Sequence, residues 1–62
     1  MDHASRTAEQ LRAYNDGWRS GHLDRSLGVT SQYAWFGVFL DPVDSYGFHY
    51  SLGYQTARCA SA

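Results

Sequence analysis

A short aromatic and glycine pattern occurs twice in this chain of 62 residues. Residues 14–21 read YNDGWRSG and residues 50–57 read YSLGYQTA, so both fit aromatic-x-x-Gly-aromatic-x-x-small. Glycine inside a helix costs about 1 kcal/mol relative to alanine, so its repetition at one place in the pattern calls for a structural reason. A small residue four positions after a glycine leaves a shallow strip where another backbone can approach. We therefore predict that two helices pack through a contact lane made of Gly17, Gly21, Gly53 and Ala57.

Apolar spacing predicts where these two helices lie. The first is expected over about residues 4–22, with Ser5 or Thr7 as N-cap. The second is expected over about residues 45–60, with Asp44 or Ser45 as N-cap. One stripe of this second helix contains the lane, and another contains Phe48, Leu52 and Cys59. A helix that is apolar on two faces is normally sandwiched, so we expect its second face to meet the middle segment or a second molecule.

The segment between the two helices is predicted less sharply. Residues 23–32 read as a linker, and the apolar run 33–40 could be a strand or two turns of helix capped by Thr30 or Ser31. We favour helix, because a single strand would have no partner in so short a chain. Asp41-Pro42 should end this element, with a turn over 41–44. The fold predicted for residues 1–62 is one small, mostly α domain: an antiparallel two-helix hairpin with a short apolar middle element.

Size and composition indicate a binding protein. A chain of this length buries only about 60% of the surface that its unfolded form exposes, and its single cysteine excludes an internal disulfide. A partner, or a second copy, would supply the missing stabilisation. Ten residues are aromatic, which favours an interface. The net charge of −1, without any lysine, is too weak for nucleic-acid binding by bulk electrostatics.

The polar N-terminal residues do not read as a signal peptide, and the longest apolar run is far short of the about 20 residues that span a membrane. A lone cysteine fits a reducing compartment. We expect a cytoplasmic protein.

No group of residues predicts catalysis. His3, His22 and His49 lack the spacing of metal ligands, and Cys59 reads as a small buried residue rather than a nucleophile. Turn and cap roles explain Asp41 and Asp44. We expect no enzyme activity, no metal and no cofactor.

Some of the aromatic side chains should instead face a partner, because a chain of this size cannot bury all ten. Phe36 and Phe39 read as core residues between the helices. The candidate binding surface consists of aromatic residues with arginine at the rim, namely Trp18, Arg19, Tyr33, Trp35 and Tyr54.

The repeated pattern, in Asp16–Gly21 and Leu52–Ala57, resembles the ribosome modulation factor group. Those are short bacterial proteins of two helices and a linker that bind and silence the ribosome. The resemblance covers about a quarter of the chain, and the family's Cys-Pro-Tyr linker and strongly basic character are absent here. The resemblance implies a pair of helices and a role on the ribosome. The chain would then contact nucleic acid only as part of a ribosome.

The function predicted from the sequence is non-catalytic binding. We expect a small accessory protein that docks on a larger cellular machine and occludes it, of the kind that phages and mobile elements encode as inhibitors. One alternative is a ribosome-silencing factor, as the resemblance implies. Another is a self-assembling structural protein that uses the second face of the second helix.

Overall fold

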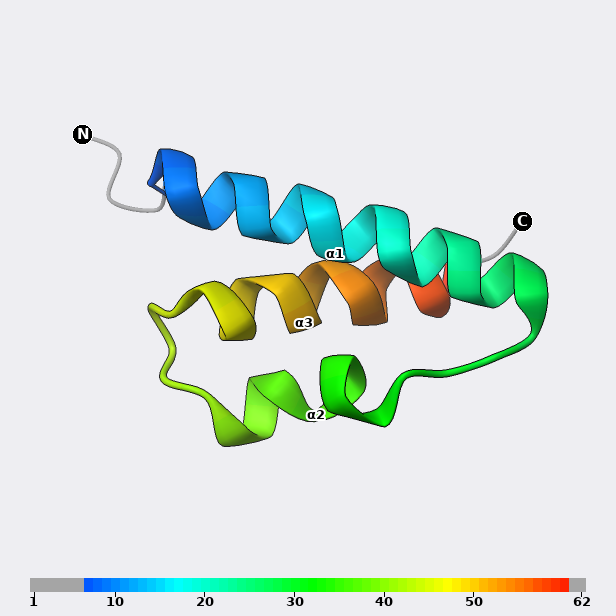
Figure 1. The fold of residues 1–62 in the computed structure, drawn as a ribbon. Coiled ribbons are helices and arrows are strands. Elements are labelled where there is room, and N and C mark those ends of the chain that lie inside the picture. Colours follow the sequence, from blue (N-terminus) through cyan, green and yellow to red (C-terminus); the bar gives the residue numbers. More distant parts are fainter. Residues whose placement is uncertain (1–6, 61–62) are drawn as a thin grey trace.

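The computed structural model describes residues 7–60, and all of their regular structure is helical. Three helices follow one another: α1 (Ala8–Leu27), α2 (Gln32–Leu40) and α3 (Tyr46–Arg58). Figure 1 shows α3 between the other two helices, with the chain reversing direction after α1 and again after α2. The mostly α prediction is therefore confirmed, and the apolar run 33–40 is helix rather than strand.

Local capping explains where α1 begins and ends. The Thr7 hydroxyl accepts the Gln10 N–H at 3.1 Å, while the Gln10 side chain accepts the Thr7 N–H at 3.0 Å. This reciprocal capping box satisfies N–H groups that have no partner within the helix. Gly28, with φ of 72°, ends the helix in the left-handed conformation that glycine adopts without strain. The helix thus runs five residues beyond the predicted end at 22, which leaves Gly21 inside it. The predicted start at residue 4 and the alternative cap Ser5 lie outside the described residues.

Serine caps the two shorter helices. The Ser31 hydroxyl accepts the Ala34 N–H at the start of α2, and the Ser45 hydroxyl accepts the Phe48 N–H at the start of α3. Asp41, in extended conformation before Pro42, ends α2 as predicted. The segment between α1 and α2 is shorter than the predicted linker 23–32, because only residues 28–31 separate the two helices. The third helix, α3, ends at Arg58 rather than near residue 60.

The direction of the helices corrects the predicted hairpin. Three tyrosines of α3 bond to three residues of α1 with a constant separation of 30 residues: Tyr46 to Asp16, Tyr50 to Ser20 and Tyr54 to Asp24. A constant separation requires that the two helices run in parallel. The apolar middle segment causes this, because as a helix it carries the chain back and adds a second reversal (Figure 1). An antiparallel hairpin is present, but α2 and α3 form it.

The predicted contact lane is the centre of the α1–α3 packing. Gly17, Gly21, Gly53 and Ala57 are all buried. A Cβ atom placed on Gly17 would overlap the carbonyl oxygen of Tyr50, and one on Gly21 would overlap that of Tyr54. From the other side, a Cβ on Gly53 would overlap the carbonyl oxygen of Tyr14 and lie 2.9 Å from the Trp18 nitrogen. The two backbones are in direct contact, as predicted.

A second close approach joins α2 to α3, and the sequence reasoning missed it. A Cβ on Gly37 would lie 2.8 Å from the Ser51 Cβ and 2.9 Å from the Gly47 carbonyl oxygen. Ser51, which has no exposed surface, accepts the Val38 N–H and donates to the Trp35 carbonyl, each at 3.0 Å. The sandwiched position of the second helix is confirmed. Its second packed face is small and polar, however, whereas Cys59 of the predicted apolar stripe is exposed.

Candidate functional site

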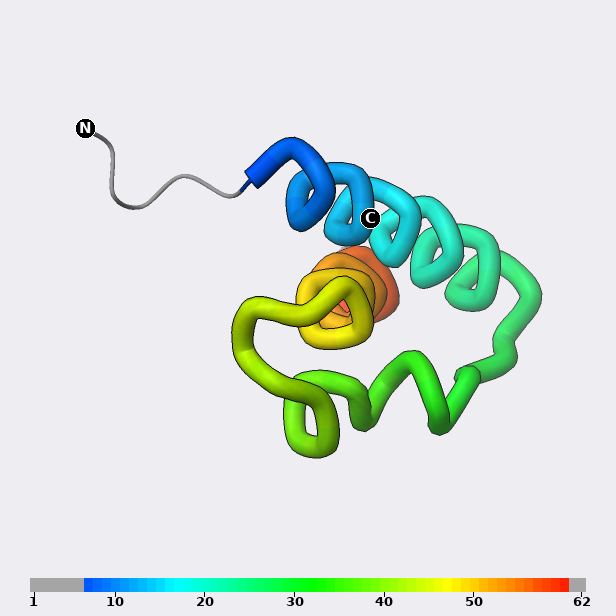
Figure 2. Tube along the Cα trace, turned by 60° about the vertical axis from the view of Figure 1, so that its left-hand side comes forward, coloured from blue at the N-terminus to red at the C-terminus, as the bar shows by residue number. Residues whose placement is uncertain are grey.

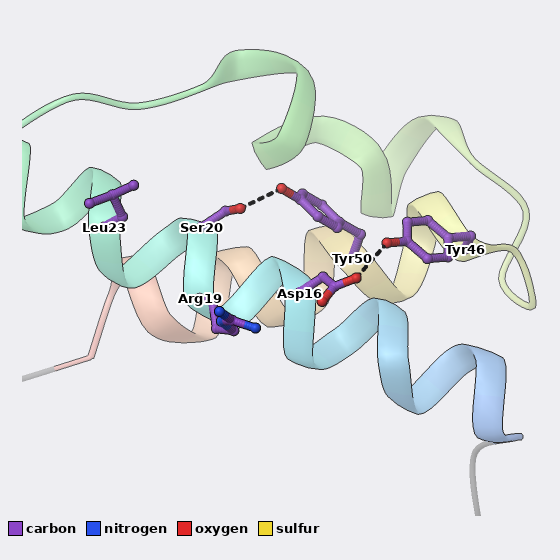
Figure 3. A pocket seen from close by; sticks show the side chains of 6 residues that line it. All are labelled: Asp16, Arg19, Ser20, Leu23, Tyr46 and Tyr50. Carbon is purple, nitrogen blue, oxygen red and sulfur yellow. Dashed lines mark hydrogen bonds between the residues drawn. The ribbon is translucent and has the colours of Figure 1, made fainter.

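Tyr46, Tyr50 and Tyr54 form a tyrosine ladder along α3, one helical turn apart. The Tyr46 hydroxyl donates to the Asp16 carboxylate at 2.9 Å, and the Tyr50 hydroxyl donates to the Ser20 hydroxyl at 2.6 Å. The rings of Tyr46 and Tyr50 stack with centroids 6.0 Å apart. Figure 3 shows both tyrosines reaching from α3 toward α1. These bonds fix the two rings in the wall of an open cleft.

The cleft between α1 and α3 has a volume of about 460 Å³. Asp16, Arg19, Ser20 and Leu23 line it from α1, and Tyr46 and Tyr50 line it from α3 (Figure 3). The lining thus combines two aromatic rings with one carboxylate and one guanidinium group. Such a surface can hold polar or charged groups of a partner.

Tyr54 is the inner end of the ladder and is a structural residue. It has no exposed surface, its hydroxyl donates to the Asp24 carboxylate at 2.5 Å, and it accepts the Ser31 N–H at 2.7 Å. One hydroxyl therefore connects the last turns of α1 to the cap of α2. Burial, followed by the hydrogen bond to Asp24, raises the pKa of Tyr54 above 10.0. The prediction that Tyr54 belongs to a binding surface is wrong, because the lane brings α1 directly over it.

The other predicted surface residues do not form one patch. Trp18 is 41% exposed on α1 and stacks on His22 with centroids 5.4 Å apart. Arg19 lines the cleft described above. Tyr33 and Trp35 lie on α2 and line different pockets. An aromatic surface with arginine at its rim is therefore not assembled from these five residues.

A different set of large, exposed apolar side chains lies on α2. Its outward side chains are large and strongly exposed, and we call them the α2 apolar face: Tyr33 (88%), Phe36 (45%), Phe39 (70%), Leu40 (74%) and, just beyond the helix, Val43 (71%). No residue of α2 carries a charge. Figure 2, seen nearly along α3, shows α2 with α3 on one side only. The reading of Phe36 and Phe39 as core residues is wrong, because glycine and serine make the close α2–α3 contact and these two side chains stay exposed.

Three further findings concern the described residues. Among residues 7–60, His, Cys, Asp and Glu side chains do not gather in groups of three that could hold a metal ion. His49 packs its ring edge-on against Phe48, with centroids 5.3 Å apart. Within the same range, no helix combines the length and the apolar character that a membrane span requires.

Sequence signals existed for part of this arrangement. Asp16, Ser20 and Asp24 repeat at intervals of four, as do the three ladder tyrosines, so the two series could have been paired in parallel register. Gly37, a glycine inside an apolar run, could have indicated that another helix packs closely against α2 at this position. Comparison of the chain with protein-family models, curated proteins and solved structures finds no match.

Proposed function

We propose that this chain is a small non-catalytic binding protein that docks on a larger protein or complex through the α2 apolar face and inhibits it by occlusion. The observation that supports this proposal is the exposure of Phe39 and Leu40, each at least 70% exposed on a helix without charge, and of Val43, 71% exposed in the turn that follows. Isolated exposed apolar residues are ordinary, whereas contiguous patches mark interaction sites. Aromatic residues contribute most when a partner buries them.

The way in which α2 is attached to α3 also supports this function. The Ser51 hydroxyl accepts the Val38 N–H, and the Ser51 and Gln55 side chains donate to the Trp35 carbonyl. These bonds hold the α2 backbone without using its outer side chains. The apolar face is thus presented on a fixed helix without taking part in the core. A surface that is ordered in advance loses less conformational freedom on binding.

The test is a binding experiment with matched variants. The double variant Phe39→Ala/Leu40→Ala removes the most exposed part of the face. The control Leu11→Ala/Leu27→Ala removes comparably exposed apolar side chains from α1. We expect the α2 variant to bind its target about 30-fold more weakly, since an anchoring aromatic residue contributes about 2 kcal/mol or more. The control should bind and inhibit like the wild-type chain.

The results also separate the alternatives. Equal binding by both variants would refute the proposed surface. Recovery of ribosomes, with affinity that falls steeply as salt rises, would favour the ribosome-silencing role. Binding to one protein target with weak salt dependence, and loss of that target's activity, would support occlusion.

Self-assembly through the same face is a second candidate, and charge placement favours it. Arg58 lies beside the first turn of α2, in a pocket with Gln32 and Phe36, while Asp41 and Asp44 lie at its other end. Antiparallel pairing of two copies would bring opposite charges together at both ends. Sedimentation of the purified chain distinguishes the candidates, because a self-assembling protein should exceed 7.0 kDa, and Phe39→Ala/Leu40→Ala should restore the monomer.

A further inference from the structure

A second cavity, of about 420 Å³, lies between α2 and α3 next to the cleft. Tyr46 and Tyr50 line both spaces. The cavity is lined by three tyrosines, one carboxylate and small residues: Ser31, Tyr33, Ala34, Asp41, Tyr46, Gly47 and Tyr50. Among these described lining residues there is no arginine or histidine. The space therefore combines aromatic rings with a single negative charge.

The rings and the carboxylate are held in place by the fold. Hydrogen bonds to α1 fix the hydroxyls of Tyr46 and Tyr50, and both residues line this cavity. The Asp41 Oδ2 atom lies so close to Gly47 that a Cβ there would overlap it. Gly47 is in the first turn of α3, where a carboxylate complements the helix dipole. Tyr33 completes the cavity from α2 and is otherwise exposed.

Two arginines of α1 are associated with the residues around this cavity. Arg19 lines the neighbouring cleft, as does Asp16. Arg12 is close enough to Tyr46 to act on it electrostatically, and it too comes from α1. Neither side chain is among those that line the cavity. Asp41 thus has no cationic side chain beside it within the cavity.

We propose that this cavity binds an organic cation, an ammonium or guanidinium group, with Asp41 as counter-ion and the rings of Tyr33, Tyr46 and Tyr50 as its contacts. Aromatic rings attract cations through the negative charge of their faces. The volume lies within the usual range for small ligands, about 300–1,000 Å³. The group can belong to a free small molecule or to a basic side chain of a protein. The proposal does not depend on docking by the α2 apolar face.

Titration followed by proton–nitrogen NMR tests the proposal on the chain alone. Each cation is paired with an uncharged molecule of the same shape: choline with dimethylbutanol, and a blocked arginine with the corresponding blocked citrulline. We expect both cations to shift the amide signals of Tyr33, Asp41 and Gly47 in a saturable way, and the neutral partners to leave them unchanged. Tighter binding of choline would point to a free ligand, and tighter binding of arginine to a side chain. Equal response to charged and neutral molecules, or no saturable response, overturns the proposal.

Two variants locate the site. Tyr33→Ala removes an 88% exposed ring and should leave the fold intact, whereas Tyr33→Phe keeps the ring and should bind like wild type. Asp41→Asn removes the counter-ion, and Asp44→Asn is its control, since Asp44 is exposed and outside the lining. We expect Tyr33→Ala and Asp41→Asn each to weaken cation binding at least about fivefold. Unchanged affinity in both variants would place any binding elsewhere and refute the site.

Discussion

Gly17 of α1 lies directly against the carbonyl oxygen of Tyr50 in α3, with no room for a single methyl group between them. One turn further along, Gly21 meets the Tyr54 carbonyl in the same way. Because the obstructing atoms belong to the backbone, they cannot turn aside as a flexible side chain would. The distance between α1 and α3 is therefore set by the absence of side chains at these positions, and the three hydrogen bonds from the ladder tyrosines to α1 depend on that distance.

Replacing Gly17 by alanine should therefore destabilise the protein, although alanine is the better helix former. The helix propensity gained is about 1 kcal/mol, while overpacking typically costs about 1–3 kcal/mol and more where the backbone must move. We expect a net loss of about 2 kcal/mol and a Tm about 10 °C lower, measured by circular dichroism. Asn15→Ala, at an exposed site of the same helix, should stabilise slightly. A Gly17→Ala variant as stable as Asn15→Ala would contradict the close contact.

Removing the Tyr54 hydroxyl should also cost stability, through a different mechanism. In Tyr54→Phe the Ser31 N–H and the Asp24 carboxylate both lose a partner. A buried polar group left unsatisfied costs about 1–3 kcal/mol, and these two bonds are only partly buried. Chemical denaturation should show a loss near the lower end of this range, about 1 kcal/mol. The control is Tyr33→Phe, which removes the same hydroxyl from an 88% exposed ring and should change nothing measurable.

Alkaline pH should weaken the fold through the same ladder. Burial raises the pKa of Tyr54 above 10.0, and the hydrogen bond to Asp16 raises that of Tyr46. A group whose pKa is raised on folding retains more protons in the native state. Its contribution is complete below pH 10 and is lost as the pH rises through the higher native value.

Denaturation midpoints measured across this alkaline range should thus fall more steeply for the wild-type chain than for Tyr54→Phe. The difference in ultraviolet absorbance between the wild-type chain and Tyr54→Phe should show that the Tyr54 hydroxyl ionises at a higher pH than an ordinary tyrosine. Ionisation of Tyr54 at the ordinary pKa of tyrosine would contradict its burial and its hydrogen bond to Asp24.

The sequence predicted the contact lane because close backbone contact leaves a direct mark, glycine where helix propensity opposes it. It did not predict the direction of the helices, because a lane of small residues accepts a parallel or an antiparallel partner equally well. Direction depended on whether residues 33–40 reverse the chain as a helix, and a short apolar run does not decide this. The surface was predicted poorly for a related reason: aromatic residues serve core and interface alike, so Tyr54 and Phe39 exchanged their expected places.

The attachment of α2 gives the last prediction. Ser51 is the buried polar residue through which α3 holds α2, accepting the Val38 N–H and donating to the Trp35 carbonyl. In Ser51→Ala both bonds are lost, and the carbonyl of Trp35 retains only the Gln55 side chain as partner from α3. We expect about 1–3 kcal/mol of destabilisation, with amide hydrogen exchange accelerating in α2 more than in α1. Thr56→Ala is the control, because the exposed Thr56 hydroxyl bonds only within its own helix, to the Leu52 carbonyl. Uniform acceleration in all three helices would instead mean that α2 has no separate attachment and opens only when the whole domain unfolds.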